Sequence, residues 1–176
     1  MAMTLITTNT ESGDANSAFT SGIDSTYKLY IFKFIDLNPA TDAAYFTFNG
    51  SIDGGSNYNV TKTTTFFRSY NAEDNSGAAL GYRTADDLAQ STDYQRLHQQ
   101  IGNAADESAA GILWLFNPSN TTYVTHFYSA VSGTDGTQSR IGLVGGYFNT
   151  TDNIDAVDFK MSSGNMDGII KMYGVG

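Results

Sequence analysis

Hydrophobic and polar residues alternate in short runs along most of the chain, and clusters of Gly, Asn, Asp and Ser separate the runs. A period of two is typical of strands, because successive side chains of a strand point to opposite faces of its sheet. In 44–49, for example, Phe46 and Phe48 share one face, and Tyr45 and Thr47 share the other. We predict nine strands by this pattern, at 4–8, 27–37, 44–49, 58–70, 111–116, 123–131, 141–148, 157–161 and 168–175. So many short strands favour a single all-β domain over residues 1–176, an antiparallel jelly-roll-like β-sandwich.

Two of the predicted strands are apolar on both faces. In 27–37, one face carries Leu29, Ile31 and Ile35, and the other carries Tyr30, Phe32 and Phe34. In 111–116, one face likewise carries Ile112, Trp114 and Phe116, and the other carries Leu113 and Leu115. A strand with one solvated face would alternate between apolar and polar residues, so we expect these two to be central or to be covered by a neighbouring subunit.

The predicted core contains Ile31, Phe46, Phe48 and Trp114. Full burial of a large apolar side chain contributes about 1.5 to 3 kcal/mol, and removing it adds the cost of a cavity. If Trp114 points inward, Trp114→Ala should therefore lower the free energy of unfolding by several kcal/mol.

One segment, 84–101, has the pattern of a short helical insertion. Thr84 can cap a helix, Asp86 and Asp87 suit its amino-terminal end, and Leu97 and Ile101 fall four residues apart. Ser91 and the residues after it interrupt the pattern, so we predict two short helical turns, at 85–90 and 93–101. They are expected to lie across one end of the sandwich.

Composition narrows the function classes. The formal net charge is −9, with 9 Lys and Arg against 18 Asp and Glu, so a nucleic-acid partner is not expected, because phosphate binding needs clustered cations. No apolar run approaches the roughly 20 residues that span a bilayer, and we expect no membrane partner. The amino terminus lacks the features of a signal peptide, and the chain has no cysteine for disulfides or thiolate chemistry.

No pattern of catalytic or metal-ligating residues is present. The two histidines, His98 and His126, have different neighbours; His98 is expected to be solvated, and His126 to pack or hydrogen-bond within a strand. Asp152, Asp155 and Asp158 recur every three residues, but their spacing fits no calcium loop, and Asp in turns commonly bonds to the backbone. We therefore expect no catalytic residue, cofactor or metal, and no enzymatic activity.

Tyrosines near loop edges are the candidates for ligand or interface contacts. An aromatic ring offers an apolar face to a sugar, while Asn and Asp can bond to its hydroxyl groups, and tyrosine is also enriched at protein interfaces. The candidates for a host-surface glycan or for a neighbouring protein are Tyr58, Asn59, Tyr70, Tyr82 and Tyr123.

The carboxyl-terminal segment 159–175 reads as two short strands joined by a Ser-Ser-Gly-Asn-Met-Asp-Gly loop, and it ends on Tyr-Gly-Val. Together with segments 4–8, 54–59, 115–127 and 145–151, it resembles small virion structural proteins of tailed phages, above all marine phages. The resemblance extends over nearly the whole chain. Such proteins are described as head-decoration or tail-fibre components.

The resemblance implies a jelly-roll-like fold and a place on the virion surface, and it transfers no catalytic residue. The expected function is non-enzymatic decoration or cementing of a capsid. The expected partners are other copies of the chain in a homotrimer, and the major capsid protein or tail proteins. A closed oligomer would bury the second apolar faces. The alternative is a receptor-binding module on a tail or fibre that binds a host surface glycan through loop residues such as Tyr58, Asn59 and Tyr82.

Overall fold

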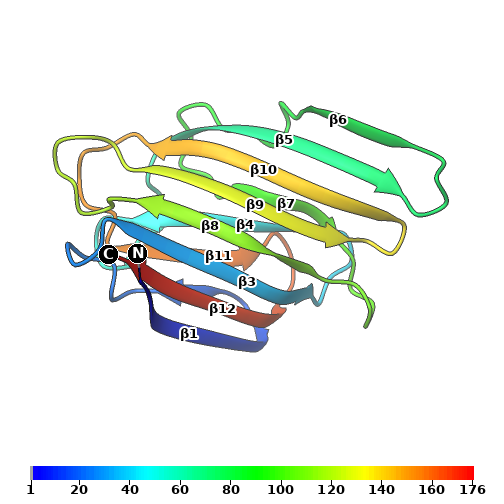
Figure 1. Ribbon diagram of the computed structural model, residues 1–176, viewed down its shortest axis with the longest axis horizontal. Coiled ribbons are helices and arrows are strands. Elements are labelled where there is room, and N and C mark those ends of the chain that lie inside the picture. The colour runs from blue at the N-terminus through cyan, green and yellow to red at the C-terminus, as the bar shows by residue number, and fades with distance from the viewer. Residues whose placement is uncertain (1) are drawn as a thin grey trace.

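The computed structural model describes residues 2–176, which form twelve strands in two antiparallel sheets (Figure 1). The larger sheet faces the viewer in Figure 1, and the smaller sheet packs behind it. The larger sheet contains, in spatial order, β1 (Met3–Asp14), β12 (Met166–Val175), β3 (Leu29–Pro39), β8 (Ala109–Phe116), β9 (His126–Thr134), β10 (Gln138–Phe148), β5 (Lys62–Ala72) and β6 (Ala78–Tyr82).

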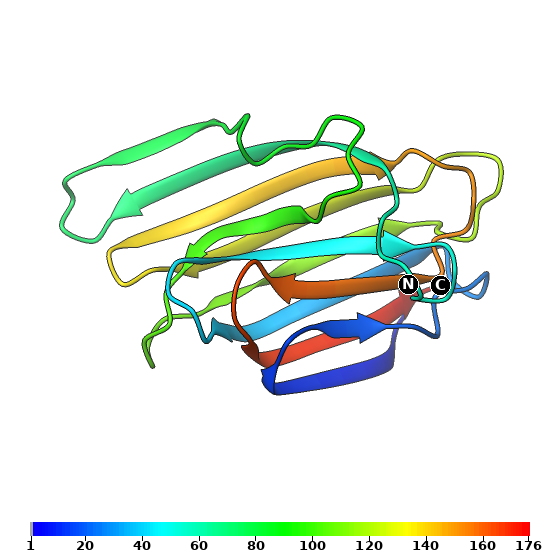
Figure 2. The same cartoon turned by 180° about the vertical axis from the view of Figure 1, so that it is seen from behind.

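The smaller sheet has four strands: β2 (Ser17–Phe19), β11 (Ala156–Met161), β4 (Ala44–Ser51) and β7 (Gln95–Ile101). It is the nearer layer in Figure 2, which shows the molecule from behind. Strand β7 is an edge of the smaller sheet, and the β5–β6 ribbon of the larger sheet extends past it. Part of the ribbon's inner side therefore lies beyond the smaller sheet.

The space between the sheets is filled mainly by phenylalanine. Phe159 of β11 lies at the centre and is fully buried. Its ring centroid is 5.2 to 6.1 Å from those of Phe19, Phe32, Phe34, Phe46 and Phe48. Because these rings come from β2, β3, β4 and β11, this cluster holds the two sheets together.

The prediction of an all-β sandwich is confirmed. The jelly-roll arrangement is not shown, because jelly rolls divide eight strands into two Greek keys, whereas this sandwich divides twelve strands into sheets of eight and four.

The helical prediction for 84–101 is wrong, since no helix occurs among residues 2–176. Residues 84–90 form turns, and 95–101 form strand β7, which pairs with β4. Leu97 and Ile101 are four positions apart, and this even separation places them on one face of a strand as well as on one face of a helix. Pairing with β4 decides between the two conformations, and both side chains are fully buried in the core.

The inward placement predicted for Trp114 is also wrong. Leu113 and Leu115 are the buried residues of β8, and Trp114 is only half-buried on the opposite face. Its ring stacks on Tyr128 of β9, with centroids 5.1 Å apart. The two faces of β8 are equally apolar in sequence, so the pattern could not select the inner one. Phe46 and Phe48 do lie in the core, as predicted.

The revised position of Trp114 changes the expected effect of its removal. Trp114→Ala leaves no enclosed cavity, because the indole is covered on one side only, and we expect it to lower the free energy of unfolding by about 1 to 2 kcal/mol. Urea unfolding of the variant measures this. A loss of 4 kcal/mol or more, about the cost of a buried Trp, would contradict the outward placement.

Candidate interaction face

The outer face of the eight-stranded sheet is the most unusual surface of the molecule. We define it as the outward side chains of this sheet. The register places Ile31 of β3 between Tyr173 of β12 and Trp114 of β8, and Trp114 opposite Tyr128 of β9. These four side chains form one apolar row across four neighbouring strands.

A second aromatic group lies on the same face nearer the β6 edge. Leu143 of β10 is paired with Phe67 of β5, which is paired with Tyr82 of β6. The Phe67 and Tyr82 rings meet edge to face with centroids 5.2 Å apart. Leu80, the next outward residue of β6, is 75% exposed.

The outer face exposes more apolar surface than is usual for an isolated domain. Its most exposed large side chains are Met3, Leu5, Phe67, Leu80, Tyr82, Phe116 and Tyr128, each at least 41% exposed. An aromatic side chain exposed to this degree leaves roughly 60 to 100 Å² in water. With the half-buried residues between them, the exposed apolar area is on the order of 500 to 800 Å², close to the share that one partner contributes to a standard protein interface.

Charge is almost absent from this face. From Leu29–Ile35 of β3 to Tyr82 of β6, no outward position in the paired rows holds Asp or Glu. On its β3–β12 side, Lys33 and Lys171 are opposite each other in the register, and the exposed Asp36 and Asp167 lie toward one end of the same two strands. The Lys33 ammonium lies 5.1 Å from the centre of the Tyr173 ring. A neutral, aromatic face on a chain of net charge −9 is the surface on which another protein can pack with little charge repulsion.

A shallow hollow interrupts the outer face near its end. It has a volume of about 320 Å³ and is lined by Ser69, Tyr70, Asn71, Ser132, Ser139, Arg140 and Ile141. Ile141 is paired with Ser69 on one side and with Ser132 on the other, which places these three residues on the outward side. The exposed Leu80 is paired with Ser69 and therefore lies beside the hollow.

The candidate contact residues predicted from sequence are spread over three places. Tyr82 alone belongs to the outer face, and its hydroxyl donates to the Asp87 carboxylate. Tyr70 lies on the inner side of β5, beneath the Arg68 guanidinium. Tyr58, Asn59 and Tyr123 lie in loops.

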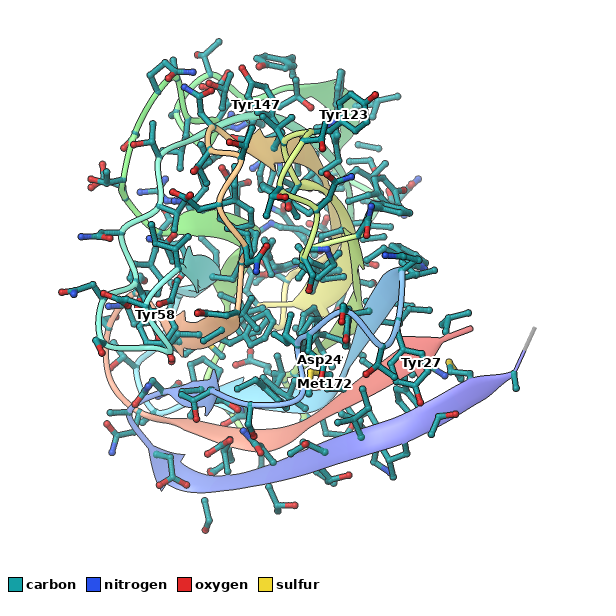
Figure 3. All side chains as sticks on the ribbon, turned by 90° about the vertical axis from the view of Figure 1, so that its left-hand side faces the viewer. Asp24, Tyr27, Tyr58, Tyr123, Tyr147 and Met172 are labelled. Carbon is teal, nitrogen blue, oxygen red and sulfur yellow. The ribbon has the colours of Figure 1, made fainter. Side chains whose placement is uncertain are left out.

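Tyr58 and Tyr123 are both visible at the end of the sandwich shown in Figure 3, on opposite sides of the view. Tyr123 is 72% exposed, whereas the Tyr58 hydroxyl is buried without a hydrogen-bond partner among residues 2–176. Burial, followed by repulsion from Asp158, raises the pKa of Tyr58. The structure therefore does not gather the loop tyrosines into one site.

Two ionisable groups inside the sandwich, Asp158 and Lys62, have internal partners. The Asp158 carboxylate accepts hydrogen bonds from Asn16 at 2.6 Å and Tyr94 at 2.9 Å, and burial raises its pKa. The fully buried Lys62 donates to the carbonyl oxygens of Val60 and Asp93, and burial lowers its pKa to about 7. These bonds tie loops to the sheets and leave neither group facing an open site.

The two histidines differ in environment. His98, expected in solvent, is 1% exposed on β7, where its Nε2 lies 3.4 Å from the Arg140 carbonyl oxygen. His126 is exposed on β9 and packs against Tyr147, as expected for a strand residue. Within residues 2–176 there is no group of three or more His, Cys, Asp or Glu arranged to hold a metal ion. No helix long and apolar enough to cross a membrane occurs in the same range.

Comparisons with known proteins identify no family. No protein-family model matches the chain, and no relative was found among curated proteins. The outer face therefore has to be interpreted from its own chemistry.

Proposed function

We propose that this chain is a non-enzymatic structural protein of a phage virion, a surface component that decorates or cements the capsid. The observation that carries the proposal is the neutral, aromatic outer face of the eight-stranded sheet. The phage assignment itself rests on the resemblance of the sequence segments described above. The partners are further copies of the chain, as a homotrimer, and the major capsid protein or tail proteins.

The outer face supports self-association because its residues suit a desolvated interface. Trp114, Tyr128 and Phe67 are residue types that are enriched at protein interfaces, and they project from a rigid sheet, so little side-chain freedom is lost when they are covered. Most carboxylates of the chain lie in loops, where their charge favours solvation of the surface outside this face.

Sedimentation velocity tests the self-association. We expect the protein at micromolar concentration to sediment as an oligomer, and Tyr128→Asp to weaken association more than tenfold, because it places a carboxylate in the aromatic row. Tyr123→Asp is the matched control, since Tyr123 is at least as exposed but lies in a loop outside the face. A monodisperse wild-type monomer would contradict the proposed oligomer.

The position on the particle is a separate measurement. Cryo-EM of the particle that carries the protein is expected to show its density at capsid symmetry axes, in contact with several capsid subunits. Density confined to the tail would instead favour the second candidate function, a receptor-binding module. The strongly exposed Tyr123 favours that candidate. Loss of binding to host cells or glycans in Tyr123→Ala, with the fold intact, would support it.

A further inference from the structure

The two sheets have four edge strands, and three of them are protected against pairing with another chain. The pairing of β1 with β12 is interrupted by register shifts, and β1 carries a charge at Glu11. Strand β2 is only three residues long, and Asn9 donates to its Ala18 carbonyl oxygen. The loop after β6 lies against β7, where Gln95 donates to the Asp86 carbonyl oxygen. Irregular pairing, charge, short length and a covering loop are the usual protections of an edge strand.

Strand β6, the fourth edge, has none of these protections. Its sequence Ala-Ala-Leu-Gly-Tyr contains neither a charged residue nor proline, and its register with β5 is regular. All five residues are exposed, and the side chain of Leu80 is the most exposed large apolar group of the outer face. Strand β6 ends the larger sheet at the upper margin of Figure 1 and has no second neighbouring strand within residues 2–176. An open edge of this kind can accept a strand from another molecule.

The register shows which backbone groups of β6 face the open edge. The Gly77 carbonyl oxygen and the Arg83 amide, immediately before and after β6, are both bonded to β5. Bonded and non-bonded residues alternate along an antiparallel ladder, so every second residue between these two bonds to β5 as well. The remaining residues, Ala78, Leu80 and Tyr82, direct their N–H and C=O groups away from β5. The open edge therefore presents a regular row of donors and acceptors.

We infer that β6 pairs antiparallel with β6 of a second copy of this chain, across a twofold axis at Leu80. This alignment places Leu80 opposite Leu80 of the second copy, and Ala78 of each copy opposite Tyr82 of the other. The N–H groups of all three residues then meet carbonyl oxygens of the second strand, as in an ordinary ladder. The eight-stranded sheets of two copies thereby join into one continuous sheet.

The side chains of β6 are compatible with a second copy of themselves. On the outer face, the small Ala78 meets the large Tyr82, and the two Leu80 side chains meet each other in an apolar cross-strand pair. On the inner side, Ala79 meets Gly81, and a Cβ at Gly81 would have no atom within 4 Å, so a second backbone can approach freely. A charged strand would meet its own charge across a twofold axis, and β6 has none.

This edge contact is separate from the outer-face contact proposed above, and it does not depend on the virion role. Leu80 and Tyr82 stay on the outer face when β6 pairs, so the Phe67–Tyr82 groups of two copies become neighbours across the joined edge. Copies that also associate through the outer face would use β6 to join one oligomer to the next.

Disulfide trapping tests the pairing directly, because the chain has no native cysteine. Opposite bonded residues of an antiparallel ladder are about 5.5 Å apart at Cα, a distance that a disulfide bridges well. Under mild oxidation, we expect Leu80→Cys to form about tenfold more linked dimer than Tyr123→Cys. Tyr123 is a matched control, since it is similarly exposed but lies in a loop.

The register is tested by mixing two single variants. Ala78→Cys and Tyr82→Cys should each link poorly to themselves, because like residues are four positions apart in the inferred alignment, and should link to each other when mixed. Adding Leu80→Pro to both proteins should reduce this link about tenfold, because proline removes an N–H at the open edge and none that is bonded to β5. Thermal unfolding shows whether the proline variant keeps the fold, and the mixed pair without proline decides the register if it does not.

Two results would overturn the inferred pairing: equal linking of Leu80→Cys and Tyr123→Cys, or no link between the mixed variants. Neither result bears on the outer-face oligomer, which sedimentation of Tyr128→Asp tests by itself. Trapping of Leu80→Cys in the Tyr128→Asp background separates the two contacts. A link that persists there supports an independent edge contact, and a link that disappears would show that β6 does not pair by itself.

Discussion

Phe159→Ala is expected to lower the free energy of unfolding by about 3 to 5 kcal/mol, a large fraction of the stability of a domain of this size. The side chain is fully buried, and its ring contacts aromatic rings from both sheets. Its removal would leave a cavity between two rigid sheets that cannot collapse onto it. The loss therefore includes a cavity term in addition to the transfer of the ring.

Denaturant unfolding of Phe159→Ala and Phe159→Leu would measure this effect. Leucine fills part of the volume, so its cost should be clearly smaller than that of alanine. If Phe159→Ala changed the stability by less than about 1 kcal/mol, the two sheets would not depend on this ring for their packing.

Lowering the pH from 6.5 to 4 is expected to reduce the free energy of unfolding by about 3 kcal/mol through the protonation of His98 alone. Burial lowers the pKa of His98 to about 4 in the folded protein, and the ordinary value near 6.5 applies after unfolding. Between these pH values the unfolded chain binds a proton that the folded chain does not. The contribution of the neutral His98 to the free energy of unfolding is therefore fully present above pH 6.5 and is lost as the pH falls toward 4.

The surroundings of His98 favour the neutral form of its ring. Its Nδ1 has no hydrogen-bond partner among residues 2–176, and the nearby Arg140 cation opposes protonation, while Asp135 favours it. Unfolding curves at pH 7.5 and pH 4.5 should differ more for the wild type than for His98→Gln, which cannot titrate. Equal pH dependence in the two proteins would show that His98 does not cause the loss.

Strand positions could be predicted from the sequence where one face is apolar and the other polar, as in β4. The apolar character of both faces of β3 was also visible, and it indicated the outer face that the structure shows. The direction of Trp114 was not predictable, because either face of β8 could have been the inner one. Strand β7 was missed because its spacing suits a helix equally well, and pairing with β4 is a tertiary effect.

The clustering of the four arginines around β7 could not have been predicted from the sequence. Arg68, Arg83, Arg96 and Arg140 lie in different segments, and an overall charge of −9 draws attention away from any local excess of cations. The topology brings the four together by placing β6 and its following loop beside β5 and by stacking β7 on the same side. Of the tyrosines considered as ligand contacts, only Tyr70 lies against this cluster.

The position of β12 between β1 and β3 has a consequence for how the chain folds. β12 must enter between two strands that are made much earlier, so this part of the larger sheet cannot close until β12 has been synthesised. Pairings so distant in sequence form slowly, and until they form the edge of β3 that pairs with β12 is open. Closure of the larger sheet is therefore expected to be a late step of folding, with self-association of incompletely folded chains as the main competing reaction.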